Sequence, residues 1–258
     1  MNSSIILSQS TKDLSMDRRH FLKILSGGAT FLGLSGSLFA GVDPKSSLVN
    51  WGRLKFPLAG SDQMDWGVHP QGDLNLIDYL TANTSLQLPN NWNVADVWRL
   101  DEMVQFPFLY MHAEDVPVLD SVARANLREY LLRGGFIFAE DCVIGRGTHG
   151  HNSRNDFFFR SMVEQLPAIM PEAKLERLPN DHPVFHVLYH LDNGMPHMQG
   201  IPHGLHALTL HGRVLAFISP SDLHCGWTNG YKWFGAEQTQ QALRMGTNIY
   251  VFAMTQSA

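Results

Sequence analysis

The sequence predicts a three-layer α/β fold, with helices on both faces of a mostly parallel sheet. The clearest step is the apolar run Phe136–Ala139, which follows a helical pattern over Ser121–Leu132 and a helix stop at Gly134-Gly135. The run ends abruptly in Glu140-Asp141-Cys142, as expected of a buried strand that reaches a ligand-binding edge. Two further apolar runs end in polar clusters in the same way, at Phe106–Met111 and Arg213–Ile218.

The elements of the first half follow from local signals. A first strand is expected over Arg53–Leu58, and Pro57 places it at a sheet edge or at the end of the strand. A short helix over Leu74–Leu80 is expected next, with Asp73 as its N-cap. Thr84–Leu88 is expected to be a second strand.

The second half contains a hairpin signal. His211-Gly212 separates two apolar runs, Leu205–Leu210 and Arg213–Ile218, with the spacing of a two-residue β-turn. Met195–Leu205 is expected to be a loop. The other elements expected here are a helix over Asp156–Leu166, a strand over Leu175–Leu178 and a closing helix over Glu237–Met254.

Composition limits the classes of function. The chain has 258 residues, of which 44% are hydrophobic and 17% charged, and this is typical of a globular protein. The formal net charge is -5, with no cluster of Lys and Arg beyond the N-terminus, so a nucleic-acid partner is not expected. Two cysteines exclude a disulfide framework, although they could form one bridge in an oxidising compartment. The 13 histidines are an unusually large number for this length.

Residues 1–40 are predicted to be a twin-arginine signal peptide. Residues 17–23 read DRRHFLK, which resembles the twin-arginine export motif, and an uncharged run over Ile24–Ala40 follows. Leu38-Phe39-Ala40 is a usable cleavage site, and an uncleaved membrane anchor or an ordinary buried helix are the alternatives. A linker over residues 41–52 and a single α/β domain over residues 53–258 follow.

This signal predicts the location and one partner. The twin-arginine translocase is the expected partner during export, and the periplasm is the expected location. The protein contacts the membrane only if the signal stays uncleaved, in which case the domain faces the periplasm. Twin-arginine export carries folded proteins, which favours folding, or loading of a cofactor, before export.

Several short motifs occur together in a characteristic order. They are Asp65-Trp66, Phe106–Met111, Leu127–Leu131 with Gly134-Gly135-Phe136, Glu140-Asp141, Asp181–His186 and Met245–Ile249. The set resembles the bacterial family catalogued as domain of unknown function 4159, over roughly Arg53 to Met254. This resemblance implies a flavodoxin-like layout similar to class I glutamine amidotransferases, and frequent export. It implies no established activity.

Cys142 lies near the position where a glutamine amidotransferase carries its nucleophile. The residues around it are Glu140-Asp141-Cys142-Val143-Ile144-Gly145, which lack the small-residue elbow that such a nucleophile needs. Two neighbouring carboxylates also raise the pKa of a thiol and disfavour the thiolate. A buried, inert cysteine is therefore the alternative to a catalytic Cys142.

Other candidate catalytic side chains follow the strands. Asp141 could act in hydrolysis with His112, Asp222 or His224, since the carboxyl ends of parallel strands meet at one edge of the sheet. Capping of the following segment is the alternative role for Asp141. His, Asp and Cys together suit zinc, but no His-x3-His or Cys-x2-Cys pair is present, so no metal ligand is assigned and the cofactor stays unknown.

Two classes of function remain from the sequence. The first is an exported, non-catalytic module that binds a small molecule or a protein partner, which the missing elbow favours. The second is a hydrolase, assisted or not by a metal. Four side chains are the candidates for ligand binding, with core packing as the alternative for the tryptophans: Asp65, Trp66, Glu140 and Trp227.

Overall fold

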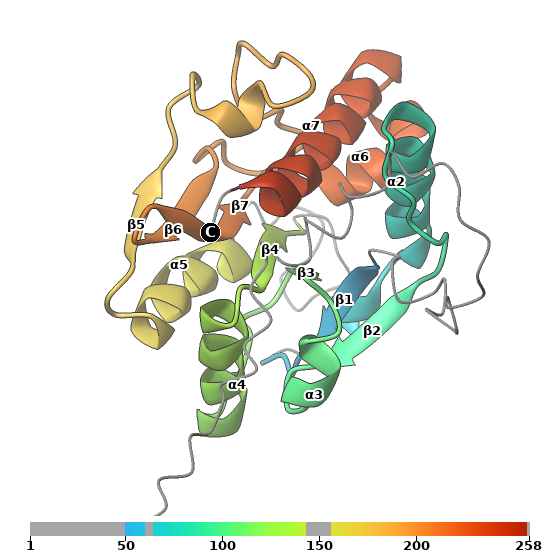
Figure 1. Ribbon diagram of the computed structural model, residues 1–258. Coiled ribbons are helices and arrows are strands. Elements are labelled where there is room, and N and C mark those ends of the chain that lie inside the picture. Colours follow the sequence, from blue (N-terminus) through green and yellow to red (C-terminus); the bar gives the residue numbers. More distant parts are fainter. Residues whose placement is uncertain (1–49, 60–63, 143–155, 257–258) are drawn as a thin grey trace, which may run out of the picture. The chain divides into compact units, whose positions relative to one another are not determined.

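A seven-stranded sheet forms the centre of a computed structural model, which describes residues 50–59, 64–142 and 156–256 (Figure 1). The strands are β1 (Trp51–Lys55), β2 (Asn93–Asp96), β3 (Phe108–Ala113), β4 (Phe136–Asp141), β5 (Lys174–Arg177), β6 (His206–Leu210) and β7 (Arg213–Ser219). Their order across the sheet is β2-β1-β3-β4-β7-β6-β5. The predicted signal peptide over residues 1–40 and most of the predicted linker over residues 41–52 lie outside the described residues.

Most of the sheet is parallel. β2, β1, β3, β4 and β7 all run in one direction, whereas β6 is antiparallel to both of its neighbours, β7 and β5. Counted along the chain, the five neighbouring parallel strands lie in the order second, first, third, fourth and fifth, which is the order of flavodoxin-like sheets. The predicted mostly parallel α/β sheet is confirmed, and the likeness to glutamine amidotransferases stays a prediction.

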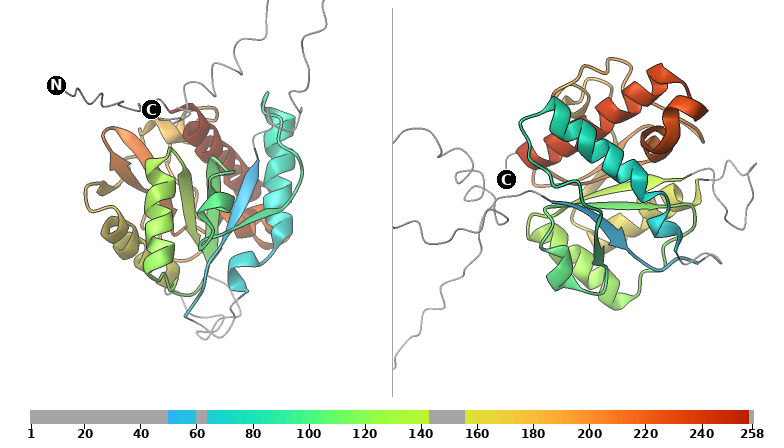
Figure 2. Two further views of the ribbon diagram at one scale, coloured as in Figure 1. Left: turned by 60° about the horizontal axis from the view of Figure 1, so that its bottom comes forward. Right: turned by 90° about the vertical axis from the view of Figure 1, so that its right-hand side faces the viewer.

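Helices cover both faces of this sheet, so the predicted three layers are present. α2 (Pro70–Asn83), α6 (Leu223–Trp233) and α7 (Ala236–Thr255) pack together on one face. α3 (Leu100–Met103), α4 (Ser121–Leu132) and α5 (Phe157–Ile169) lie on the other face. Figure 2 shows the sheet between the two layers. Two short 3-10 helices are present as well, η2 (Asp65–Gly67) and η3 (Pro183–Phe185).

The two central strands explain the unbroken apolar runs in the sequence. Every residue of β3 and of β4 is buried, because helices cover both faces of the sheet at this point. The burial extends to the polar residues at the strand ends, including His112, Glu140 and Asp141. Groups that the sequence places at an open edge therefore lie in the protein interior.

Local signals account for the helix and hairpin boundaries. Asp120 caps α4 by accepting a hydrogen bond of 2.8 Å from the N–H of Ala123. Gly134, with φ of 99°, ends the same helix in a conformation that only glycine adopts easily. His211 and Gly212 both have positive φ, which matches the twist of the strands in the β6–β7 hairpin.

One strand prediction in the first half is wrong, and another needs new bounds. Thr84–Leu88 forms no strand, because the Thr84 hydroxyl donates to the carbonyl of Leu80 and accepts from the N–H of Leu86, which turns the chain. The second strand is instead β2, whose four residues are too few to give a periodic pattern. The first strand is present as β1, shifted to Trp51–Lys55; it lies between β2 and β3, so of the two predicted roles for Pro57 the edge is wrong and the end of the strand agrees.

Two helix boundaries also differ from the prediction. α2 begins at Pro70, and Asp73 is not its cap but a fully buried residue within the helix. α6 was not predicted, because Gly226 and Gly230 interrupt the helical spacing of its apolar residues. A Cβ atom at Gly226 would lie 2.5 Å from the Cβ of Ala242, so the glycine permits the close contact between α6 and α7. Within the described part of the chain, no helix has both the length and the apolar character needed to cross a membrane.

Candidate functional site

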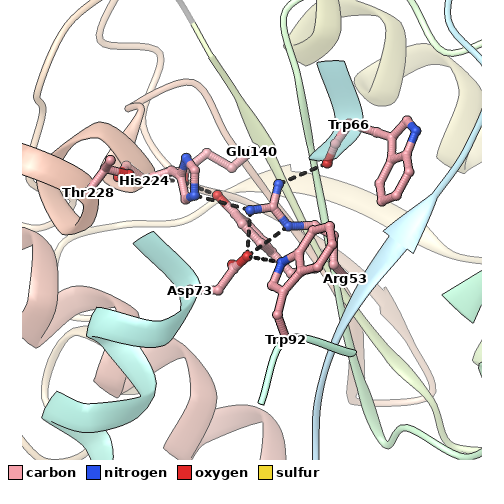
Figure 3. A network of polar contacts seen from close by, with 8 residues as sticks. Arg53, Trp66, Asp73, Trp92, Glu140, His224 and Thr228 are labelled. Carbon is pink, nitrogen blue, oxygen red and sulfur yellow. Dashed lines mark hydrogen bonds and ion pairs between the residues drawn. The ribbon is translucent and has the colours of Figure 1, made fainter. Parts of the chain in front are cut away.

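A buried ion pair joins the middle of β1 to α2. Arg53 of β1 donates two hydrogen bonds to Oδ2 of Asp73 in α2, from Nε at 3.1 Å and from Nη2 at 2.6 Å (Figure 3). Neither side chain is exposed to solvent. Burial raises the pKa of Asp73 above its ordinary value, and the charge of Arg53 opposes that rise.

Further contacts surround this ion pair. Arg53 donates from Nη1 to the carbonyl of Trp66 at 2.9 Å, and its Nη2 lies 3.1 Å from Nε2 of His224. The guanidinium carbon also lies 4.8 Å from the centre of the Tyr110 ring. The indole of Trp92 donates to the same Asp73 oxygen at 2.8 Å. The arginine thus links β1, η2, α2 and α6 through one buried charge.

Glu140, at the end of β4, holds the first turn of α6. Its carboxylate accepts hydrogen bonds from the backbone N–H groups of Leu223 at 2.8 Å and His224 at 3.2 Å. The hydroxyls of Tyr110 and Ser219 donate to it as well, at 2.8 Å and 3.2 Å. Burial raises the pKa of Glu140 to about 8, and the nearby Asp222 carboxylate adds to the rise.

Asp141 points away from Glu140, because successive side chains of a strand lie on opposite faces. Its carboxylate accepts a 2.7 Å hydrogen bond from the N–H of Phe159, in the first turn of α5. Burial raises the pKa of Asp141 well above its ordinary value, and this hydrogen bond opposes the rise. On the same side, Asp156 lies 2.7 Å from Nε2 of His203, whose ring stacks on Phe159. Asp141 therefore binds the start of α5.

Asp222 is the N-cap of α6. It has φ of 54° and ψ of 47°, and its carboxylate accepts from the N–H of Cys225 at 3.4 Å. The side-chain amide of Gln199 donates to its other oxygen. The carboxylates of Glu140, Asp141 and Asp222 thus all accept hydrogen bonds from the first turns of helices. The helix dipole favours negative charge at these positions.

Two imidazoles and two thiols lie beside these caps. The ring centres of His112 and His224 are 4.3 Å apart, as the sequence predicted for groups that meet at this edge. Burial lowers the pKa of both rings well below the ordinary value, so both are neutral at pH 7. The hydrogen bond between the Cys142 and Cys225 thiols, together with burial, raises the pKa of Cys142 well above its usual range. A thiol in this state is a poor nucleophile.

The other predicted ligand-binding residues lie in packed surroundings. Trp66 is 5% exposed and stacks on Trp92, with ring centres 6.1 Å apart. Trp227 is 3% exposed and donates from its indole to the carbonyl of Ala242 at 2.9 Å. Asp65 accepts a 2.7 Å hydrogen bond from the N–H of Glu114. The structure brings neither tryptophan to an open surface.

Sequence reasoning missed Arg53, Asp73 and Tyr110 as members of this site. Arg53 lies between the buried Trp51 and Leu54, and a cation inside such a run indicates a buried partner. Nothing in the local sequence identifies that partner, since Asp73 resembles an ordinary helix cap. Tyr110 lies inside an apolar run, where its hydroxyl gives no signal of the carboxylate that it binds.

A separate cavity of about 200 Å³ lies at the amino end of β6, beside Ser221. Its wall combines one cation, amide groups and apolar side chains, and it contains no acidic residue among the positions that the structure describes. The lining residues are Arg177, Leu178, Asn180, Phe185, Asn193, Met195, His197, Pro202, Gly204, Leu205 and Ser221.

A family model described as "Domain of unknown function (DUF4159)" matches residues 54–254 of the chain. The match covers the whole of the sheet except for the first three residues of β1. Among curated proteins, none matches this sequence.

Proposed function

The chain belongs to the family DUF4159, whose description states no activity, and from this premise we propose that the domain is a non-catalytic module that binds a small, polar, anionic ligand. The observation that carries the proposal is the cavity beside Ser221, because its lining is cationic and rich in amides. Its volume of about 200 Å³ is below the roughly 300–1,000 Å³ of pockets that hold drug-sized molecules, so the ligand is small.

The cavity wall is shaped around Arg177. A Cβ atom at Gly204 would lie 2.6 Å from Nε of Arg177, so the glycine makes room for the guanidinium against the backbone. Gly204 also has φ of 81°, a conformation that other residues rarely adopt. An arginine held in this way presents a fork of donors that matches a carboxylate.

The other polar groups of the cavity favour hydroxyls on the ligand. Asn180 and Asn193 each offer both a donor and an acceptor, and Ser221 adds a hydroxyl. A hydroxyl group needs partners of both kinds. A small hydroxylated carboxylate, such as a sugar acid, is therefore the ligand class that fits the cavity best.

The carboxylates at the carboxyl edge support binding over catalysis. Asp141, Glu140 and Asp222 each accept a backbone hydrogen bond from a helix N-terminus, so each carboxylate already has a structural role. A hydrolase would need one of them within reach of a substrate. Asp141 in particular lies on the α5 side of β4, whereas His112 and Glu140 pair in register on neighbouring strands.

We also propose that the domain works outside the cytoplasm. The support for this is the twin-arginine pattern over residues 17–23 and the uncharged run that follows it. The expected location is the periplasm, either free after cleavage or anchored by an uncleaved signal. The test is fractionation of cells that produce the chain with Arg18→Lys and Arg19→Lys, which should hold it in the cytoplasm. Unchanged export of this variant would contradict the proposal.

The ligand proposal is tested with Arg177→Gln and a matched control, Lys174→Gln. Both residues lie in β5 and both are exposed, but only Arg177 lines the cavity. Thermal unfolding is measured with gluconate, glucuronate, tartrate and citrate. A ligand at one hundred times its Kd stabilises the folded state by about 2.7 kcal/mol, which raises Tm by about 5–10 °C for a domain of this size.

The two variants give opposite expectations. Arg177→Gln should lose the rise in Tm, and Lys174→Gln should keep it. A rise that persists in Arg177→Gln would place the ligand elsewhere. If no acid raises Tm, and native mass spectrometry of the exported protein finds no bound small molecule, the binding proposal is wrong.

A further inference from the structure

A cluster of metal-binding side chains lies in the interior, apart from the cavity. One ligand atom from each of His112, Cys142 and Asp222 lies within 4.8 Å of the other two, and all three residues are buried. They come from three different elements: β3, the residue after β4, and the N-cap of α6. Cys225, in the first turn of α6, contacts both the Cys142 thiol and the Asp222 carboxylate. We call these four residues the His-Cys cluster.

His112 gives independent evidence for a ligand here. Its side chain is fully buried, and neither ring nitrogen has a hydrogen-bond partner in the part of the chain that the structure describes. A buried polar atom without a partner costs about 1–3 kcal/mol, so protein interiors seldom keep one without a reason. A metal ion bound by the ring provides that reason for one of the two nitrogens.

We propose that the His-Cys cluster binds one Zn²⁺. One imidazole, two thiolates and one carboxylate are all common zinc ligands, and four protein ligands make a closed tetrahedral site. A closed site has no open position for a substrate, so the ion would stabilise the fold and would not act in catalysis. Magnesium and calcium are disfavoured, since they require oxygen ligands.

Three of the four ligands need only small side-chain movements to take the ion. Ligand atoms at 2.0–2.3 Å from zinc are about 3.3–3.8 Å apart, so the atoms of His112, Cys142 and Asp222, now within 4.8 Å of one another, approach by at most about 1.5 Å. The Cys225 thiol, which lies beside Cys142 and Asp222, must also turn toward His112. Binding converts the two thiols to thiolates and releases two protons, and no oxidant or reductant takes part. The side-chain amide of Gln199 donates a hydrogen bond to Asp222 and so fixes the orientation of this carboxylate.

A second group of metal-type residues provides the matched control. His186, His190 and Asp192 also place ligand atoms within 4.8 Å of one another, but His190 and Asp192 are exposed. Surface groups of this kind are common without a metal. Removing the two histidines therefore tests whether metal binding depends on the buried cluster or on the surface.

This inference goes beyond the proposed ligand and does not depend on it, because Arg177 and its cavity supply none of the four residues. The experiment uses the full chain, stripped of metal, incubated with Zn²⁺ or Co²⁺ and freed of excess metal. Elemental analysis gives the metal per chain, and the Co²⁺ form reports thiolate ligands through its charge-transfer absorption. The variants are Cys225→Ser, Asp222→Asn, and the control pair His186→Gln with His190→Gln.

We expect one metal per chain for the natural protein and for the control pair. Cys225→Ser should bind metal at least about tenfold more weakly and lose about half of the charge-transfer absorption. Asp222→Asn should bind more weakly but still fold, because asparagine also caps helices and tolerates positive φ. Circular dichroism verifies that each variant is folded.

Three results would overturn the proposal. The first is no bound metal in the natural protein after incubation with Zn²⁺. The second is metal that is lost in the control pair and kept in Cys225→Ser. The third is a Cys142–Cys225 disulfide in the exported protein, two mass units lighter than the dithiol, since that bond removes both thiolate ligands. None of these results bears on the binding of sugar acids at Arg177.

Discussion

Replacing Asp73 with asparagine should remove the one carboxylate that Arg53 binds within the described residues, while leaving the shape of the site almost unchanged. Arg53 and Asp73 are both fully buried, and two hydrogen bonds of 3.1 Å and 2.6 Å join them. In Asp73→Asn the guanidinium stays in the interior and faces a neutral amide. Because a buried charge without its partner is costly, we expect the variant to lose about 3–5 kcal/mol of unfolding free energy.

That loss is large compared with the whole stability of a domain, which is about 5–15 kcal/mol. The double variant Arg53→Met with Asp73→Leu removes both charges and keeps a similar volume. It also gives up the hydrogen bond to the carbonyl of Trp66 and the contact with the Tyr110 ring, each worth about 1–2 kcal/mol. We therefore expect the double variant to be destabilised, but by less than Asp73→Asn.

The assay is urea unfolding followed by tryptophan fluorescence, since the chain has 6 tryptophans and several lie in this region. Asp78→Asn is the matched control, because Asp78 lies in the same helix but is exposed. Its cost should stay within about 0.5 kcal/mol. Two results would refute the reasoning: a loss of less than about 1 kcal/mol of unfolding free energy in Asp73→Asn, or a double variant that is less stable than Asp73→Asn.

Three further predictions concern local features. Burial lowers the pKa of His182, so as the pH falls the unfolded chain binds a proton at this imidazole before the folded chain does. The stability that depends on the neutral ring is therefore complete above about pH 6.5 and is lost as the pH falls below it. His182→Asn, which keeps an acceptor for the N–H of Val184, should show a smaller fall in Tm between pH 7.5 and pH 5.5 than the natural protein. Gly226→Ala should lower the urea midpoint by the equivalent of about 1–3 kcal/mol, because the new methyl group meets Ala242 at 2.5 Å; an unchanged midpoint would show that α6 and α7 can separate freely. Asp120→Ala should lower the urea midpoint in the same assay through loss of the α4 cap, and Asp120→Asn should recover most of that loss.

The elements with long, regular patterns could be predicted from the sequence. The helix over Ser121–Leu132 and the strand after it follow from helical spacing, a glycine stop and an apolar run, and the structure confirms both. The β6–β7 hairpin follows from His211-Gly212, since few dipeptides suit that turn. β2 and α6 could not be predicted, because their patterns are short or interrupted by glycines that serve packing between helices.

The candidate site shows the same limit more sharply. The sequence correctly places polar groups after β3, β4 and β7, but it does not show what each group binds. Glu140 and Asp141 are neighbours in the chain, yet one accepts from the first turn of α6 and the other from the first turn of α5. The alternation of side chains along a strand separates them, and only the packing of the helices decides which helix each one meets.

By itself, then, the sequence determined the class of fold and the edge of the sheet where polar groups gather, because apolar periodicity, glycine stops and turn residues act over a few neighbouring positions. The tertiary structure alone decided the partners at that edge. Arg53 meets Asp73, and His112 meets Cys142 and Asp222, across separate elements of the chain. Such contacts depend on strand order and helix packing, and no local pattern records which buried charge, imidazole or thiol will lie beside another.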